Sequence, residues 1–580
     1  MAGDVFMGSV GGCLGMGKFA ILNANHARVD TSSGARCTSK NPVYTQGFTG
    51  SLHGSSHGSK HRKSYGPRPR AGKWDELKLW QMGYRQELLR SFTMLNSLAL
   101  CTSVLSFFAL SDTYGKYGLA YGGPISVVWG WVICSVFSLV VAFCLAELLS
   151  AFPTSGGIYY WSWVMAPVRH RTAICWMAGW LNLLGQVAFT AGLEYSLAEA
   201  IAGVVYMHTG GPSGMGVRLS KSALFGIVAL MLLVHAILNS MSPSITAYVS
   251  IVSFFWHVVA TLALCTVLLC TARHLNSVKY VLTTWASDRA SHGIKNPVYC
   301  FLMGLLMSQW TIMGYDASIH IVEETIDGEN AGSLALVGSV TMCSGLGFVL
   351  LLSLTFAMPS MYNVLSEDNA TGGHGAILQL LWDVFKQRYD NGYGALGLAY
   401  VPLVGLFFCA NASLCANARM AYAFSRDGAM PGARIWRQLN RGSHLPVKAC
   451  WLMAVLALLL TLPCVYNDLF FATVSAGSVV ALSLSYGIPI CLRIFHNKHS
   501  FIPGPFNLGW AGRPMAVVAC SWILLTSVVF TLPTTYPVTP GSANYTAALI
   551  TAVLTIAAFL FYAPGFGGKV WFTGPAPNLG

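Results

Sequence analysis

Residues 308–325 read SQWTIMGYDASIHIVEET and continue an apolar run at 296–307, NPVYCFLMGLLM. The first part of this stretch has the composition of a membrane span, yet Asp316 lies inside it, with His320, Glu323 and Glu324 behind. An ionisable side chain is costly at membrane depth and is usually paired or functional there. The stretch therefore raises the question of which role the Asp316 carboxylate has inside a span.

The composition of the whole chain is that of a membrane protein. Of its 580 residues, 54% are hydrophobic and 9% are charged, and the mean hydropathy is +0.56. A soluble chain carries roughly 25% charged residues, so this one could not cover a globule of its size with solvated groups. The apolar runs are continuous rather than alternating, which favours helices over a β-barrel. We predict an all-α, multi-pass membrane protein.

About twelve apolar runs approach the ~20 residues that a helix needs to cross hydrocarbon. Spans one and six, which lie five spans apart, are each interrupted by small and polar residues well before their ends. Interrupted helices at corresponding positions of two halves indicate an inverted-repeat transporter with its substrate site at the breaks. The predicted spans are 92–110, 124–150, 172–205, 222–240, 247–271, 297–322, 333–357, 395–424, 447–464, 468–492, 514–533 and 545–563.

Residues 1–90 contain no long apolar run and are rich in Gly, Ser, His, Lys and Arg. Such a segment cannot bury enough surface to offset its ordering entropy, so we expect a disordered basic tail; a transit peptide is the alternative. Most basic loops fall on the side of this tail, which places both termini in the cytosol. The basic segment 272–296 is the exception. The net charge of +13 then reflects topology and anionic lipid rather than nucleic acid.

Two roles are open for Asp316. It can cap the helix that restarts at ASIHIVEE, because an Asp there accepts hydrogen bonds from the next N–H groups, or it can contact substrate or a proton. His320, Glu323 and Glu324 follow at helical spacing on one face, which we expect to line the inner vestibule. Neither this spacing nor the sixteen cysteines form a metal-binding pattern, and we expect no metal and no cofactor.

Three motifs carry a resemblance to a known family: LAELLSAFPTSGGIYYWSWV (145–164), GYDASIHIVEET (314–325) and ARMAYAFSRDGAMP (418–431). Over nearly all of 85–565 the chain resembles the amino-acid/polyamine/organocation superfamily, and within it the amino acid/choline transporter branch. The resemblance implies twelve helices in a five-plus-five inverted repeat with discontinuous helices one and six. It also implies secondary transport of amino acids or of GABA-like, choline-like or polyamine-like amines, coupled to protons or to exchange.

The resemblance also implies an organisation and a site. The expected parts are a tail (1–90), a transporter domain (91–565, with repeat one at 91–272, repeat two at 297–493 and extra helices at 514–563) and a C-terminal tail (566–580). The substrate site is placed at breaks near 103–108 and 314–317, lined by Ser103, Ser106, Phe107, Gly314, Tyr315, Asp316 and Ala317. At the first break, members of the family that this chain resembles carry a sequence similar to LTGI, whereas this chain reads LSFF (105–108). A phenylalanine there removes close backbone approach and can fill the pocket.

Two further buried ionisable groups are candidates. Glu194 in span three lies where relatives carry an acid, so it either meets a substrate amine or pairs with a neighbouring helix. His257 in span five has no charged neighbour in its run. It either carries a coupling proton or is a neutral histidine bonded to a carbonyl of a neighbouring helix. We expect Glu147 to form a packing or gating pair, and His235 to be a satisfied core histidine.

The function expected is a secondary transporter in the plasma membrane or an internal membrane, with lipid around it and a small amino acid or amine as substrate. The alternative is a nutrient receptor that keeps the fold and has lost transport, which the phenylalanines at the first break would fit. An enzyme is not expected, because the chain shows no nucleophile–base pair, phosphate loop or metal spacing.

Overall fold

The computed structural model describes residues 74–578, except 468, 497–500 and 566. Within these residues the named elements are all helices, and the β-pairing consists of a single bridge between Phe92 and Thr325. The predicted all-α class is confirmed. Most of the predicted N-terminal tail, residues 1–73, lies outside the described residues.

Nine helices of the described residues are long and apolar enough to cross a membrane. Three shorter apolar helices, α3 (Met94–Val104), α13 (Pro297–Thr311) and α23 (Thr546–Tyr562), complete the twelve predicted spans in order. The long helices are α5 (Ala120–Ala151), α7 (Arg171–His208), α8 (Lys221–Met241), α9 to α10 (Pro243–Thr271), α15 (Gly328–Ala357), α18 (Gly394–Arg426), α20 (Val447–Thr461) with the 3-10 turn that extends it to Val465, α21 (Leu469–Phe495) and α22 (Gly512–Val529).

The second span begins at a kink inside α5. Gly123 has φ +63°, and a Cβ at that position would lie 2.8 Å from the carbonyl oxygen of Ala286. Only glycine fits such a position. Pro124 then opens the straight part of the helix, where its missing N–H costs nothing, so the straight helix starts where the apolar run predicted.

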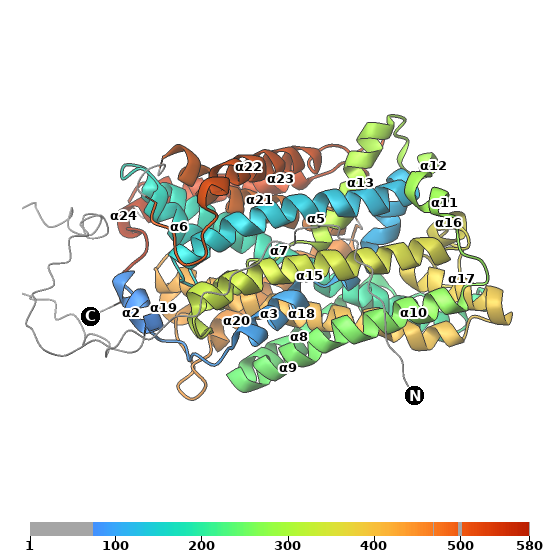
Figure 1. The fold of residues 1–580 in the computed structure, drawn as a ribbon, viewed down its shortest axis with the longest axis horizontal. Helices are drawn as coiled ribbons and strands as arrows, with labels where there is room; N and C mark the ends of the chain where they lie inside the picture. The colour runs from blue at the N-terminus through green and yellow to red at the C-terminus, as the bar shows by residue number, and fades with distance from the viewer. Residues whose placement is uncertain (1–73, 468, 497–500, 566, 579–580) are drawn as a thin grey trace, which may run out of the picture. The chain divides into compact units, whose positions relative to one another are not determined.

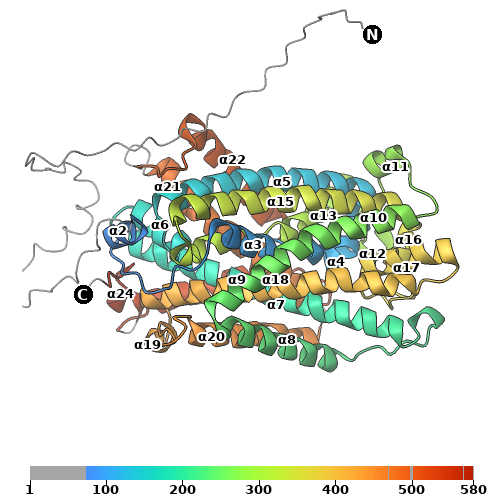
Figure 2. The same ribbon diagram turned by 60° about the horizontal axis from the view of Figure 1, so that its bottom comes forward.

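Two pairs of long helices that lie five spans apart pack against one another, although α7 packs at least as extensively along α21, the tenth span. Span two (α5) runs along span seven (α15), and span three (α7) runs along span eight (α18); Figure 1 and Figure 2 both show α5 beside α15. These two pairs agree with the predicted inverted repeat, which stays a prediction.

Both predicted interruptions are present. The first helix ends at Val104, and the chain resumes as a short 3-10 helix, η1 (Phe107–Ala109), after two non-helical residues. In the sixth span, α13 ends at Thr311, residues 312–316 are not helical, and α14 (Ala317–His320) follows. Ser103 therefore lies in the helix before the first break rather than in the break, and Ala317 opens the helix after the second.

The bundle has two distinct ends (Figure 1, Figure 2). We call one end the terminal face; it carries α2 (Trp74–Gln81), α6 (Gly157–Met165), α19 (Ala433–Trp436) and α24 (Gly568–Trp571). The opposite end carries α11 (Val278–Thr283), α12 (Arg289–His292), α16 (Met361–Leu365) and α17 (Ala376–Tyr389). The segment 74–90, predicted as part of the disordered tail, is folded here, because its apolar residues Leu79, Tyr84 and Leu88 are buried.

Candidate functional site

The two interruptions touch one another. Gly314 has φ +89°, and a Cβ there would lie 2.8 Å from Val104 Cγ1 and 3.0 Å from the ring of Phe189. Val104 is the last helical residue before the first interruption, so the non-helical backbone of both spans lies in one place. Non-helical backbone is tolerated at membrane depth where it lines a cavity or is buried in protein, and broken helices that meet are typical of transporter substrate sites.

The first interruption is tied to span five by a histidine. His257 Nε2 lies 2.7 Å from Ser106 Oγ, and His257 Nδ1 lies 2.8 Å from the carbonyl oxygen of Ser253. Ser103 Oγ donates to Ser253 Oγ at 2.6 Å, a second link between the same two segments. A neutral histidine can donate at one nitrogen and accept at the other, so His257 is satisfied here without an extra proton. The carbonyl belongs to its own helix, not to a neighbouring one.

Two phenylalanines close around this histidine. The rings of Phe107 and Phe108 lie 5.6 and 5.5 Å from the His257 ring, and both side chains are buried. A Cβ at Gly405 of α18 would lie 2.1 Å from the Phe108 ring, so this ring is seated against α18. The N–H of Phe108 already donates to Ser106 Oγ at 3.3 Å. The first break is thus packed with aromatic rings, as its sequence departure predicted.

Asp316 stands at the N-cap position of α14, but its side chain makes no capping bond. Its Oδ2 instead accepts from Asn182 Nδ2 at 3.0 Å and Gln186 Nε2 at 2.8 Å, both on α7. The predicted capping role is therefore wrong, because the amides of another helix reach the carboxylate. Asp316 Oδ1 is buried and forms no direct hydrogen bond among the described residues, although the buried Tyr486 hydroxyl lies close enough to interact with this carboxylate. One carboxylate oxygen is thus bound by two amides, and the other forms no direct bond to a described residue.

A histidine of the same span lies beside this carboxylate. His320 Nε2 lies 3.3 Å from Asp316 Oδ2, and His320 Nδ1 lies 3.1 Å from the carbonyl oxygen of Ser155. Both ring nitrogens of His320 therefore face oxygen atoms, one on its own span and one on the segment before α6.

Comparison with known proteins agrees with this architecture. Residues 89–554 match the family model described as amino acid permease. The chain belongs to the amino acid permease family. It is 35% identical to amino-acid permease BAT1 of Arabidopsis thaliana over 504 residues, which cover 87% of this chain and 96% of the relative. The rice (Oryza sativa subsp. japonica) homolog of BAT1 is 34% identical, covering 87% and 95%. The choline transporter of Saccharomyces cerevisiae is 28% identical, covering 80% and 79%. The resemblance carried by the three motifs is confirmed.

One predicted substrate contact of the permease lies elsewhere. Glu194 Oε1 is 2.6 Å from His235 Nδ1 on α8, and both side chains are fully buried. Gly192 faces Trp310 of the sixth span, and Glu194 projects about 200° further round the helix. The structure thus gives Glu194 a partner on a neighbouring helix, the alternative role. The residues brought to the two breaks are Ser103, Ser106 and Phe107, and Gly314, Tyr315, Asp316 and Ala317.

The amides that hold Asp316 were missed by sequence reasoning. Asn182 and Gln186 lie four residues apart in an apolar span, and that spacing puts them on one helix face. Two amides on one face of a buried helix are a signal for a polar partner, because buried amides are nearly always hydrogen-bonded. Which span supplies that partner depends on how α7 packs.

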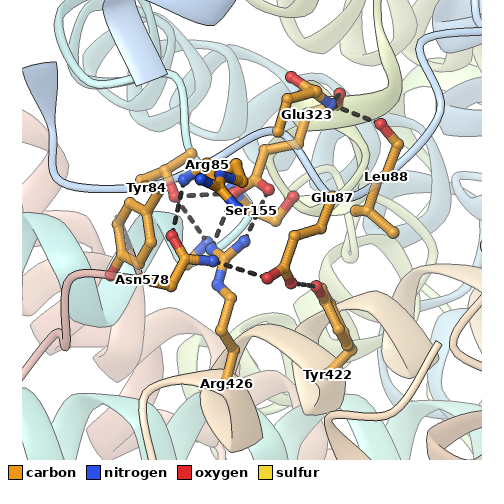
Figure 3. A network of polar contacts seen from close by, with 12 residues as sticks. Tyr84, Arg85, Glu87, Leu88, Ser155, Glu323, Tyr422, Arg426 and Asn578 are labelled. Carbon is orange, nitrogen blue, oxygen red and sulfur yellow. Dashed lines mark hydrogen bonds and ion pairs between the residues drawn. The ribbon is translucent and has the colours of Figure 1, made fainter. Parts of the chain in front are cut away.

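The terminal face holds a network of polar contacts (Figure 3). Arg426 at the end of α18 donates to both carboxylate oxygens of Glu323, at 2.8 and 2.9 Å. The N–H of Ser155 and the hydroxyl of Thr154 also donate to Glu323 Oε1. Gln86 donates to the carbonyl of Glu323 at 2.8 Å. The span-six region just past the second break is thereby fixed to α18 and to the segment before α3.

A second buried ion pair lies beside the first. Arg419 Nε donates to Glu324 Oε1 at 2.7 Å and Arg419 Nη2 to Glu324 Oε2 at 3.2 Å, and each side chain is 1% exposed. The prediction that these glutamates share one helix face with His320 is wrong. The helix stops at His320, and a 3-10 turn, η5 (Val322–Glu324), turns the acids toward two arginines of α18.

The predicted pair at Glu147 is confirmed. Its carboxylate forms an ion pair with Arg493 of α21, and the N–H of Leu508 donates to Glu147 Oε1 at 3.2 Å.

Asp427, at the end of α18 on the terminal face, is a buried acid. Burial raises the pKa of Asp427 to about 6, although Arg426 opposes the rise. Tyr84, Tyr159 and the N–H of Ala576 all donate to the Asp427 carboxylate at 2.7–3.0 Å.

This environment predicts how the stability of the permease depends on pH. A raised pKa means that the folded state prefers the protonated Asp427, so the stabilisation is complete below the ordinary pKa near 4 and is lost as pH rises through 6. We expect Asp427→Asn, which stays neutral, to melt above the unchanged protein at pH 7 and close to it at pH 4, a difference of roughly 2–3 kcal/mol. Thermal unfolding in detergent between pH 4 and 7 measures this. Asp390→Asn, exposed at the opposite end, is the matched control. A constant offset between Asp427→Asn and the unchanged protein at all pH values contradicts the prediction.

A cavity of about 450 Å³ opens at the opposite end and is lined in part by Arg218, Lys386 and Asp383. It does not reach either interruption. Its buried acid, Asp383, already accepts from Asn363 and Gln379, each at 2.7 Å. The interruptions, rather than this cavity, are therefore the candidate site.

Proposed function

We propose that the permease is a secondary active transporter of amino acids or related small amines, with its substrate bound between the two interruptions. The contact of Gly314 with Val104 and Phe189 supports this, because it brings the non-helical segments of spans one and six together beside a buried carboxylate. The terminal face is the cytosolic side in this proposal, in keeping with the predicted orientation.

The chemistry of the two breaks supports a substrate that carries an amine. Asp316 Oδ1 is a buried acceptor that forms no direct hydrogen bond among the described residues, and an ammonium group supplies donors to such an acceptor. The first break offers less to a carboxylate than its counterpart in the family, because aromatic rings pack around it and Ser106 occupies the Phe108 N–H. Relatives named as amino-acid permeases and as a choline transporter fit this range of substrates.

We further propose that transport is coupled to protons through His257. Its Nε2 is bonded to Ser106 at the first break, so adding a proton reverses the direction of that bond and alters the segment that meets the substrate. A histidine titrates near neutral pH when water reaches it and prefers its neutral form when it is buried. When the transporter opens to either side, water reaches His257, which then takes up or releases the proton.

Asp316→Asn tests the substrate site. We expect transport into proteoliposomes to fall several-fold more than the amount of folded protein, because asparagine keeps one acceptor oxygen but loses the charge opposite His320 and the amine. Labelled alanine, glutamate, arginine, GABA, choline and putrescine form the substrate panel. Asp368→Asn, an exposed aspartate of the outer loop, is the control. Equal transport per folded molecule would show that the charge of Asp316 has no role. Binding of a substrate without accumulation by the unchanged protein would favour the receptor alternative.

A further inference from the structure

The C-terminal tail of the permease is seated on the terminal face in a fixed register. The ring of Phe572, which is 3% exposed, lies 5.2 Å from the ring of Trp176. Gly574 has φ +97°, and a Cβ there would lie 2.2 Å from Trp163 Nε1. The tail thus crosses an aromatic surface at a position that only glycine fits, and residues 575–578 are brought over the polar network.

One residue of this tail, Asn578, is hydrogen-bonded to the segment between α2 and α3 (Figure 3). The N–H of Asn578 donates to the carbonyl of Gly83 at 3.1 Å. Its side-chain oxygen accepts from the N–H of Arg85 at 2.6 Å, and its amide nitrogen donates to Glu87 Oε1 at 2.8 Å. Asparagine offers both a donor and an acceptor on one side chain, and here both are used on the segment 83–87.

The segment 83–87 is the part of the chain that must move away if the terminal face opens. It leads directly into α3, which carries the first interruption, and it is bonded to the region that follows the second. The N–H of Phe92 donates to the carbonyl of Glu324 at 3.0 Å, and the N–H of Ile326 donates to the carbonyl of Phe92 at 2.9 Å. Release of a substrate from between the breaks through the terminal face requires these two segments to separate.

We propose that residues 574–578 form a strap that holds the terminal face closed and must let go of residues 83–87 before the face can open. The inference rests on the proposed function for its role in transport, but not for the existence of the strap. Each hydrogen bond contributes modestly, so loss of the two side-chain bonds of Asn578 should shift the ratio of closed to open molecules by roughly tenfold.

Hydrogen–deuterium exchange of the full-length permease in nanodiscs, with no substrate added, tests the strap. We expect amides of residues 83–92 to exchange roughly tenfold faster in Asn578→Ala, and at least as fast in a chain that ends at Thr573. Pro577→Ala, at an exposed neighbour in the same tail, is the matched control and should exchange like the unchanged protein. Unaltered exchange at 83–92 in both test variants overturns the strap. Faster exchange spread over α15 and α18 as well also overturns it, because the tail would then stabilise the whole fold.

Transport measured on the same variants separates this inference from the proposed function. Faster exchange at 83–92 in a protein that carries no substrate of the panel leaves the strap standing and removes the transporter proposal. Unchanged exchange in a protein that does transport removes the strap alone. Where both hold, Asn578→Ala should alter the rate of net release toward the terminal face more than the affinity for substrate.

Discussion

Replacing Arg419 with methionine is expected to remove most of the folded permease from the membrane. The change leaves Glu324 as a buried charge without its counter-ion, since both side chains are 1% exposed. Breaking a buried ion pair from one side costs about 3–5 kcal/mol, which is a large share of the stability of a typical protein. The measurement is the amount of monodisperse protein recovered after solubilisation, with its thermal unfolding midpoint.

Two variants make this expectation specific to the pair. Arg434→Met changes an exposed arginine of the short helix α19 and should leave recovery unchanged. Arg419→Met combined with Glu324→Leu removes both charges and should recover most of the lost stability, because apolar side chains can replace a buried pair at little cost. A double variant as unstable as the single one would mean that packing around Arg419, not charge, supplies the stability.

His257→Gln is expected to abolish proton-driven accumulation while leaving exchange of substrate across the membrane. Glutamine can keep a bond to Ser106 Oγ, whose distance from His257 Nε2 is 2.7 Å, but it cannot titrate. A gradient of one pH unit can drive about a tenfold accumulation, and the variant should lose that gain. Uptake into proteoliposomes at fixed internal pH and varied external pH measures it, with counterflow of labelled substrate as the test of an intact site.

His274→Gln, an exposed histidine between spans five and six, is the control for this experiment. If His257→Gln keeps the pH profile of the unchanged protein and still accumulates substrate, His257 is structural. The proton, if transport needs one, then travels by another group, and the Asp316–His320 pair at the second break is the next to examine.

The spans and their interruptions could be predicted because they depend on local composition. A run near 20 apolar residues fixes a span whatever it packs against, and the straight part of α5 begins after the kink at Gly123, where the apolar run begins. The partners of buried polar groups could not be predicted in this way. Capping of its own helix was one of the two roles open for Asp316, and its carboxylate bonds instead to Asn182 and Gln186. That choice depends on helix packing, which a single sequence does not encode locally.

The same limit explains the remaining differences. The role of Glu194 was open between a substrate amine and a neighbouring helix, and its partner is His235, on a helix separated from its own by a long loop. The segment 74–90 was assigned to the tail because it is short and polar, yet its few apolar residues dock on the terminal face. Docking of a short segment is a tertiary effect, since so few residues cannot bury a core of their own.

The two arginines that hold Glu323 and Glu324 both belong to α18, and this decides which parts of the permease can move. Pulling either pair apart would strand buried charges at a cost of about 3–5 kcal/mol each, so the span-six region beyond the second break and α18 must travel as one rigid body. The segment before α3 is attached to that body through hydrogen bonds with one charged partner each: Arg90 donates to the carbonyl of Thr325, Tyr422 donates to Glu87, and Tyr84 donates to Asp427. Breaking such a bond costs less than breaking a buried ion pair, so we expect an opening at the terminal face to separate the segment before α3 from α18 rather than to pull the ion pairs apart.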